Sequence, residues 1–178
     1  MAVYTSVSDD ALAAFLTEYD LGEPVAFKGI AEGVENSNYY LETTKGRFIL
    51  TLFEKRANPE DLPYFIALKQ HLADHGFSCP LPVAAKDGAA LRTLSGRPAV
   101  VVTFLQGLSP RVPNAAQCRE LGAGLAKLPQ AAADFEQTRA NSLGPTNWPA
   151  LWEGRAAHAE YLQAGLAAKI AQALSVIK

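Results

Sequence analysis

The chain has 178 residues, enough to bury a sizeable core, and its hydrophobic content of 49% is typical of a globular protein. The formal net charge of -2 gives no electrostatic reason to expect nucleic acid or an anionic membrane surface as a partner. Cys79 and Cys118 form no zinc or disulfide pattern, and no apolar run approaches the roughly 20 residues that a membrane span needs. We therefore expect a cytoplasmic protein.

The first predicted helix follows Ser8, a residue type that caps helices by accepting from their backbone N–H groups. Apolar residues then share one helix face, and Gly22 is suited to close the helix at its C-terminal side. Residues 24–30 follow as a predicted opening strand. The apolar face consists of Leu12, Phe15, Leu16 and Tyr19.

The stretch from Gly29 to Phe53 is typical of a β-hairpin. Its first arm lies within residues 34–44, its second arm is the apolar run 48–53, and the pair Lys45-Gly46 is the predicted turn. Small polar residues open the first arm, and their exposed backbone N–H groups offer donors to the phosphate oxygens of a nucleotide. The alternative is a plain turn, because Asn and Ser favour turns. These loop residues are Glu35, Asn36, Ser37 and Asn38.

After the hairpin, Asn58-Pro59-Glu60-Asp61 is a helix-start signal, with acidic residues at the positive end of the helix dipole. The two acids would alternatively pair with a cation near the phosphates, but capping is their more common use. Apolar residues then recur at helical spacing from Leu62 to Gly76, which predicts a helix that crosses behind the sheet.

The next segments are predicted strands separated by turns. Asp87-Gly88 is a turn before the strand 89–94, and Ser95-Gly96 turns the chain again. Arg97–Leu105 is the most apolar β-like run and predicts a buried strand.

Beyond residue 107 the pattern becomes helical. Asn114 begins a predicted helix that Pro129 is expected to stop, residues 138–148 resemble a linker, and a stripe from Leu162 to Leu174 predicts one alanine-rich helix that runs to the end of the sequence. The order of elements predicts an α+β fold: an antiparallel sheet with one crossing helix, then a helical lobe. We place the lobes at residues 1–107 and 108–178.

Metal and classical nucleotide motifs are not found. His71 and His75 have the i, i+4 spacing of a chelating pair, but HLADH lacks the glutamate of a hydrolytic zinc motif, so we interpret the pair as a solvated helix end. Gly29 and Gly33 form neither GxGxxG nor a P-loop. We predict no metal ligand in this chain.

Four stretches together carry a resemblance to a known family: GVENSNY (33–39), FILTLFEKR (48–56), SCPLPV (78–83) and FLQG (104–107). With them, the chain up to about Trp152 resembles the first part of the bacterial homoserine kinases of the aminoglycoside-phosphotransferase-like type. The resemblance implies a protein-kinase-like fold that uses ATP and Mg²⁺ to phosphorylate the hydroxyl of L-homoserine, a step toward threonine. Residues 1–107 would be the nucleotide-binding lobe.

The resemblance also implies where the nucleotide lies. The phosphates would lie under the loop 35–38, and adenine would lie against the strand that links the lobes. This strand matches Thr103, Phe104, Leu105 and Gln106.

Two departures from kinase patterns concern the chemistry. The catalytic loop HxDxxxxN is absent, since none of the three histidines begins it, and in the family it lies beyond position 178. We therefore predict no catalytic residue here, an inactive isolated chain and magnesium ligands outside it.

The strand lysine of many kinases is also absent: the chain has Leu50-Thr51 at that place. Arg47 and Lys55 lie four residues away, about 13 Å along a strand, and we keep Thr51 and Lys55 as nucleotide-binding candidates.

A third departure is Leu128-Pro129, where the family is expected to have leucine or methionine followed by histidine. Two alternative functions remain open. One is another small-molecule kinase of the superfamily, of the choline or aminoglycoside type, and the other is a non-catalytic nucleotide-binding fragment.

Overall fold

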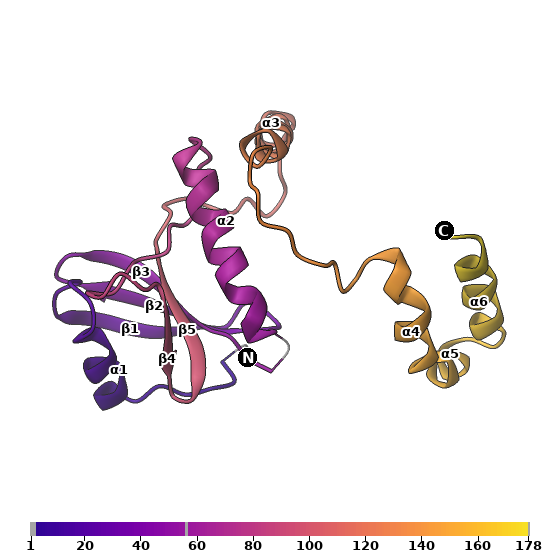
Figure 1. Cartoon of the computed structure of the whole chain (residues 1–178), viewed down its shortest axis with the longest axis horizontal. Coiled ribbons are helices and arrows are strands. Elements are labelled where there is room, and N and C mark those ends of the chain that lie inside the picture. Colours follow the sequence, from indigo (N-terminus) through magenta and orange to yellow (C-terminus); the bar gives the residue numbers. More distant parts are fainter. Residues whose placement is uncertain (1–2, 56, 178) are drawn as a thin grey trace. The chain divides into compact units, whose positions relative to one another are not determined.

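The computed structural model describes residues 3–55 and 57–177, and the chain divides into two compact units, Met1–Gln137 and Thr138–Lys178 (Figure 1). In chain order the first unit contains α1 (Asp9–Leu16), β1 (Pro24–Ile30), β2 (Ser37–Thr43), β3 (Gly46–Leu52), the short 3-10 helix η1 (Pro59–Asp61), α2 (Leu62–Asp74), β4 (Leu91–Leu94), β5 (Arg97–Thr103) and α3 (Ala115–Ala131). The second unit contains η2 (Pro145–Asn147), α4 (Trp148–Glu153), α5 (Ala156–Leu162) and α6 (Leu166–Val176).

The five strands form one antiparallel sheet in the order β1-β2-β3-β5-β4. The predicted hairpin is confirmed as β2 and β3, but its turn is Thr44-Lys45 and not Lys45-Gly46. Gly46 pairs directly with Thr43 as the first residue of β3. The Thr43 hydroxyl oxygen accepts from the Lys45 N–H at 3.2 Å, which stabilises the tighter turn.

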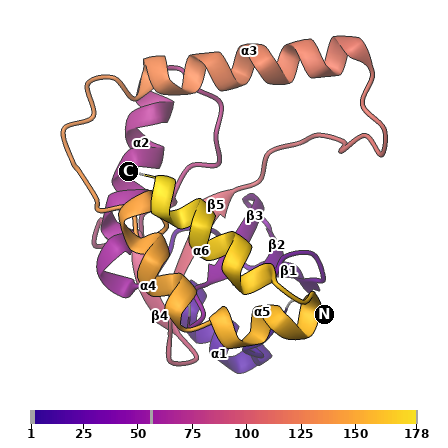
Figure 2. The same cartoon turned by 90° about the vertical axis from the view of Figure 1, so that its right-hand side faces the viewer.

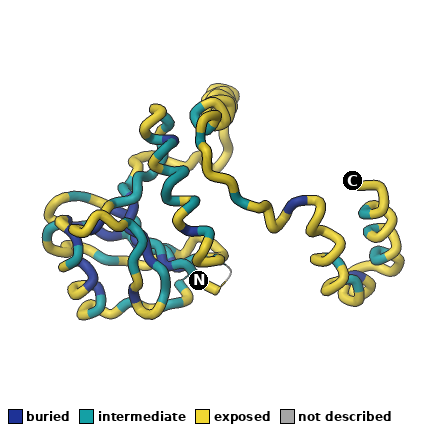
Figure 3. The backbone as a smooth tube through the Cα atoms, in the orientation of Figure 1, coloured by how far each residue is buried: buried dark blue, intermediate teal, exposed yellow. Residues whose placement is uncertain are grey.

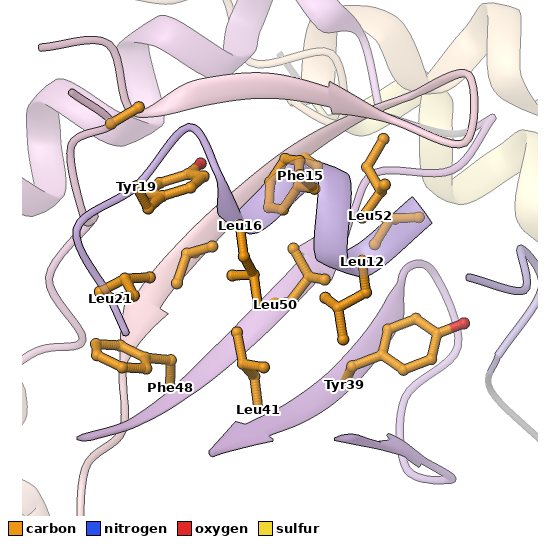
Figure 4. Close-up of a cluster of buried hydrophobic side chains, with 14 residues drawn as sticks. Leu12, Phe15, Leu16, Tyr19, Leu21, Tyr39, Leu41, Phe48, Leu50 and Leu52 are labelled. Atoms are coloured by element: carbon orange, nitrogen blue, oxygen red, sulfur yellow. The ribbon is translucent and has the colours of Figure 1, made fainter. Parts of the chain in front are cut away.

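One face of the sheet forms the main core with α1. Burial alternates along β2 and β3, as expected for strands with one covered face. The Ser8 side chain caps α1 by accepting from the Ala11 N–H at 3.2 Å, as predicted. Figure 4 shows the α1 side chains Leu12 and Leu16 directed toward Leu50 and Leu41 of the hairpin. This packing fixes which face of the hairpin remains available for a ligand.

The crossing helix predicted after the hairpin is α2, and it packs against part of the opposite face. Its residues Leu62 and Ile66 line a small cavity of about 210 Å³ together with Val100 and Val102 of β5. The Asn58 side chain caps the helix start by accepting from the Glu60 N–H at 3.2 Å. Asn58 is thus a helix cap, as expected, and the acids Glu60 and Asp61 follow it in the first turn.

The helix α3 begins as predicted, with a capping box between Asn114 and Gln117. Pro129 lies inside this helix, so the prediction that proline stops it was wrong. Proline removes one backbone donor only, and the helix closes three residues later, where the Ala132 N–H bonds the Leu128 carbonyl at 3.1 Å. Figure 3 shows α3 exposed along most of its length, in contrast to the sheet and α1.

The second unit differs from its prediction. The expected single helix is two helices, because Gly165 has a left-handed backbone (φ 76) between α5 and α6. The Glu160 carboxylate accepts from the backbone N–H groups of Gly165 and Ala167, at 2.8 and 2.9 Å, and so caps α6. The predicted linker also ends in an additional helix, α4.

The predicted lobe boundary between residues 107 and 108 falls between β5 and α3, where strands give way to helices. The two compact units divide later, after Gln137. The boundary of the nucleotide-binding lobe stays a prediction.

Candidate functional site

The loop before β2 is anchored by a fully buried hydroxyl. Ser37 Oγ accepts from the backbone N–H groups of Tyr4 and Thr5, at 2.8 and 3.1 Å, and donates to Glu54 Oε1 at 2.7 Å. The other Glu54 oxygen pairs with Arg97 Nε at 3.1 Å. The end of the loop is thereby tied to the N-terminal segment, to the end of β3 and to β5.

The anchor requires an ionised carboxylate at Glu54. Burial by itself would raise the pKa of this carboxyl, but hydrogen bonds from Ser37 and Thr5 and the charge of Arg97 outweigh it and hold the pKa below its ordinary value. At neutral pH Glu54 is therefore charged and accepts charge-assisted hydrogen bonds.

The two asparagines of the candidate phosphate loop are held by their oxygens. Asn36 Oδ1 accepts from the Glu54 N–H at 3.4 Å, and Asn38 Oδ1 accepts from the Thr51 hydroxyl at 2.8 Å. Among the described residues neither NH₂ group has a hydrogen-bond partner in the protein. These two amide groups are fixed in place and retain donors of the kind that phosphate oxygens accept.

The strand register places Asn38 and Thr51 on the sheet face opposite the α1 core. Asn38 pairs with Thr51, and Tyr40 pairs with Ile49, so these half-buried side chains form one patch on β2 and β3. We call Asn38, Tyr40, Ile49 and Thr51 the open face. It is polar at the loop end and apolar at the other end.

The residues expected to hold adenine lie next to the apolar end of the open face. The Phe104 ring meets Tyr40 edge to face, with centroids 5.7 Å apart, and the Phe104 N–H bonds the Arg47 carbonyl at 3.2 Å. Thr103 is fixed by a 2.9 Å bond from the Leu81 N–H to its hydroxyl oxygen. Leu105 and Gln106 then leave the sheet and are exposed.

The charged candidates Glu35 and Lys55 line a separate cavity of about 460 Å³, beside Glu54. Lys55 lies beyond Leu52, the last residue of β3, so the spacing of about 13 Å along a strand does not apply to it. The guanidinium of Arg47, the other cation considered, lies 5.7 Å from the centre of the Phe104 ring. The cavity is lined by Tyr4, Val34, Glu35, Glu54, Lys55 and Arg97.

Sequence reasoning missed Tyr4, Glu54 and Arg97. Glu54 stands inside the stretch FILTLFEKR, but nothing nearby in the sequence indicates that its partners are Ser37 and Arg97. Such contacts between distant segments depend on the sheet register.

We expect the Glu54 anchor to weaken in acid. Because its folded-state pKa is lowered, its contribution to stability is fully present above the unfolded pKa, about 4.3, and is lost as pH falls through the lower folded-state value. Chemical unfolding of Glu54→Gln and the parent should therefore differ most at neutral pH and converge as the pH falls through the lowered folded-state pKa of Glu54. The exposed variant Glu32→Gln should stay within about 0.5 kcal/mol of the parent. A constant difference across pH would contradict this role.

Comparisons with known proteins give the family. The model of the phosphotransferase enzyme family matches residues 26–177. The chain is 67% identical over 170 residues to a homoserine kinase of Hyphomonas neptunium, covering 96% of this chain and 52% of that protein. It is 56% identical over 177 residues to a homoserine kinase of Bradyrhizobium diazoefficiens, covering 99% of this chain and 54% of that protein. The chain thus spans about half the length of these curated relatives.

A solved structure shares the fold. A spectinomycin phosphotransferase in complex with ADP and spectinomycin matches with a TM-score of 0.54 and 11% identity, covering 88% of this chain and 56% of that one. This match confirms the α+β kinase-like fold predicted from the sequence. No helix among the described residues is long and apolar enough to cross a membrane. The family model matches most of this chain, which shows that the chain belongs to the phosphotransferase enzyme family.

Proposed function

We propose that the whole protein transfers a phosphoryl group from ATP to the hydroxyl of L-homoserine, and that this chain supplies its nucleotide-binding part. The observation that carries the proposal is the 67% identity to a homoserine kinase over 96% of this chain. The two free cysteines, Cys79 and Cys118, suit a reducing cytoplasm, which we propose as its location.

In this proposal the triphosphate lies at the polar end of the open face. The NH₂ groups of Asn36 and Asn38 and the backbone of the loop at Glu35 supply donors, and Thr51 orients Asn38 through its 2.8 Å hydrogen bond. The hydroxyl of Ser37 is used inside the protein, so Ser37 fixes the position of the loop. Preorganised donors of this kind are the main contribution a protein makes to phosphoryl transfer.

The adenine ring lies at the apolar end in this proposal. Phe104, held against Tyr40, offers an aromatic surface, and the exposed segment at Leu105 and Gln106 offers backbone groups to the ring edge. Thr103 holds the start of this segment through its bonds with Leu81. The distribution of polar and apolar groups on the open face thus fits a nucleotide in one orientation.

Charge balance explains why a cation is needed. The cavity beside the loop contains the carboxylates of Glu35 and Glu54 as well as the cations of Lys55 and Arg97, and Arg97 is already paired with Glu54. Lys55 is therefore the cation we propose for the phosphates, in place of the missing strand lysine. Magnesium neutralises the remaining phosphate charge, and we place its ligands outside this chain, with the HxDxxxxN loop that supplies the proton acceptor.

We predict that the full-length protein releases ADP in the presence of L-homoserine and Mg²⁺, measured in a coupled assay. The 178-residue chain alone should bind ATP without turnover, because it contains no HxDxxxxN motif. Choline and spectinomycin serve as comparison substrates for the two alternative kinase types. If the full-length protein prefers choline or spectinomycin, L-homoserine is not its substrate. If the 178-residue chain alone releases ADP with homoserine, the proposal that the catalytic residues lie outside this chain is wrong.

Lys55→Ala should weaken ATP binding by about tenfold, which is about 1.4 kcal/mol, because it removes the cation that we assign to the phosphates and that lines the cavity beside the loop. The matched control is Lys45→Ala, since Lys45 lies in the hairpin turn and pairs with Asp20. Isothermal titration with ATP measures both variants. Equal affinities of the two variants would show that Lys55 has no role in phosphate binding.

A further inference from the structure

A cluster of two histidines and an aspartate lies at the C-terminal end of α2. His71 and His75 are one helical turn apart, and their rings are stacked with centroids 4.1 Å apart. Asp134, in the segment just after α3, meets both: its Oδ1 lies 3.0 Å from His71 Nε2 and its Oδ2 lies 3.2 Å from His75 Nε2. In Figure 2, the C-terminal end of α3 lies at this end of α2, and Asp134 follows shortly after it. The cluster is separate from the candidate nucleotide site.

The hydrogen bond on the far side of His75 fixes which nitrogen can bind a cation. His75 Nδ1 lies 2.9 Å from the His71 carbonyl oxygen, which only accepts, so Nδ1 carries the hydrogen. In neutral imidazole Nε2 then presents a lone pair to the Asp134 carboxylate, which is also an acceptor when ionised. Two acceptors 3.2 Å apart need a positive charge between them, either a proton or a metal ion.

We propose that His71, His75 and Asp134 form a binding site for a divalent ion of the zinc class. The three donor atoms lie within 4.8 Å of one another. Two imidazoles and a carboxylate are a known ligand set for zinc, nickel or copper, and a ligating histidine commonly donates its other N–H to a backbone carbonyl, as His75 does. Three protein ligands leave a fourth position for water.

The side chains have the freedom to close around an ion. Metal bonds of about 2.0–2.2 Å at tetrahedral angles hold two ligand atoms roughly 3.3–3.6 Å apart. The nitrogen–oxygen pairs that now lie 3.0 and 3.2 Å apart must therefore separate slightly, and the widest pair of donors, within 4.8 Å, must close. Exposed side-chain fractions of 41% for His75 and 68% for Asp134 permit this adjustment and give solvent access, while His71 is held by the Phe135 ring at 5.1 Å between centroids. Imidazole ligands favour zinc over magnesium, so this site would not serve the magnesium of phosphoryl transfer.

The ion would act as a clamp between α2 and the end of α3. The apolar residues of α3 contribute little to this attachment, since Leu121 and Leu125 are 65% and 61% exposed. A cavity of about 550 Å³ also separates parts of the two helices, with His75 on one side and Lys127 on the other. Metal binding would therefore stabilise the position of α3 on α2, which few other contacts support.

The test is calorimetric titration of Zn²⁺ and Ni²⁺ into the chain after removal of metal by a chelator. The chain carries Cys118→Ser, because this exposed thiol would compete for the ions. We expect one ion per chain, at least a tenfold loss of affinity in His75→Gln and in Asp134→Asn, and no change in His158→Gln, the matched control at the third histidine. Circular dichroism of each variant confirms that it folds.

The unfolding temperature distinguishes an ion that joins α2 to the segment after α3 from an ion that binds only the two histidines of α2. An ion that binds only the folded state raises the unfolding temperature by an amount that grows with the logarithm of its concentration divided by Kd, so Zn²⁺ should raise it more in the parent and in His158→Gln than in Asp134→Asn. Binding by Asp134→Asn as tight as by the parent would reduce the site to a histidine pair and overturn the proposal. The proposal would also be overturned if His158→Gln lost binding, or if the parent bound Zn²⁺ no better than millimolar. A proton would then lie between His75 and Asp134 in place of the ion.

Discussion

The hydrogen bonds of the Ser37 hydroxyl are the interaction on which the rest of the first unit depends. Ser37 stands at the end of the inward row of β2, where the next inward residues, Tyr39 and Leu41, are apolar. A buried hydroxyl without partners destabilises a protein by about 1–3 kcal/mol, but here it serves two backbone donors and the charged Glu54. One small side chain thus holds the N-terminal segment, the loop before β2 and the end of β3 together.

This arrangement separates the two tasks of the hairpin. The inward face of β2 and β3 packs on α1 and supplies stability, whereas the open face carries the asparagine and threonine side chains that we assign to the nucleotide. The period of two along a strand produces both faces from one stretch of sequence. A ligand that binds the open face therefore leaves the core side chains in place.

Most of the sheet could be predicted from the sequence because its signals are local. The first arm within residues 34–44, the apolar run 48–53 and the turn signal between them predict the paired strands, and Ser8 and Asn114 predict helix starts. The errors arose where a local signal was outweighed. Pro129 stays inside α3 because its missing donor costs one hydrogen bond near the helix end, and Gly165 divides the last helix because Glu160 caps the new start.

The candidate site could be predicted only in part for the same reason. Loop residues such as Asn36 and Asn38 show their polar character in the sequence, but the pairing of Glu54 with Arg97 depends on how β3 and β5 meet. The histidine pair on α2 has a recognisable spacing, yet its third member, Asp134, is 59 residues from His75. Contacts of this range follow from the fold and not from any short motif.

We propose that the open face and the loop before it hold the nucleotide while the catalytic residues lie outside this chain. The most direct measurement is a titration of the isotope-labelled 178-residue chain with a non-hydrolysable ATP analogue and Mg²⁺, followed by amide chemical shifts. We expect the largest shifts at residues 34–38, Thr51 and 103–106. Shifts confined to other parts of the chain, or none at saturating nucleotide, would contradict it.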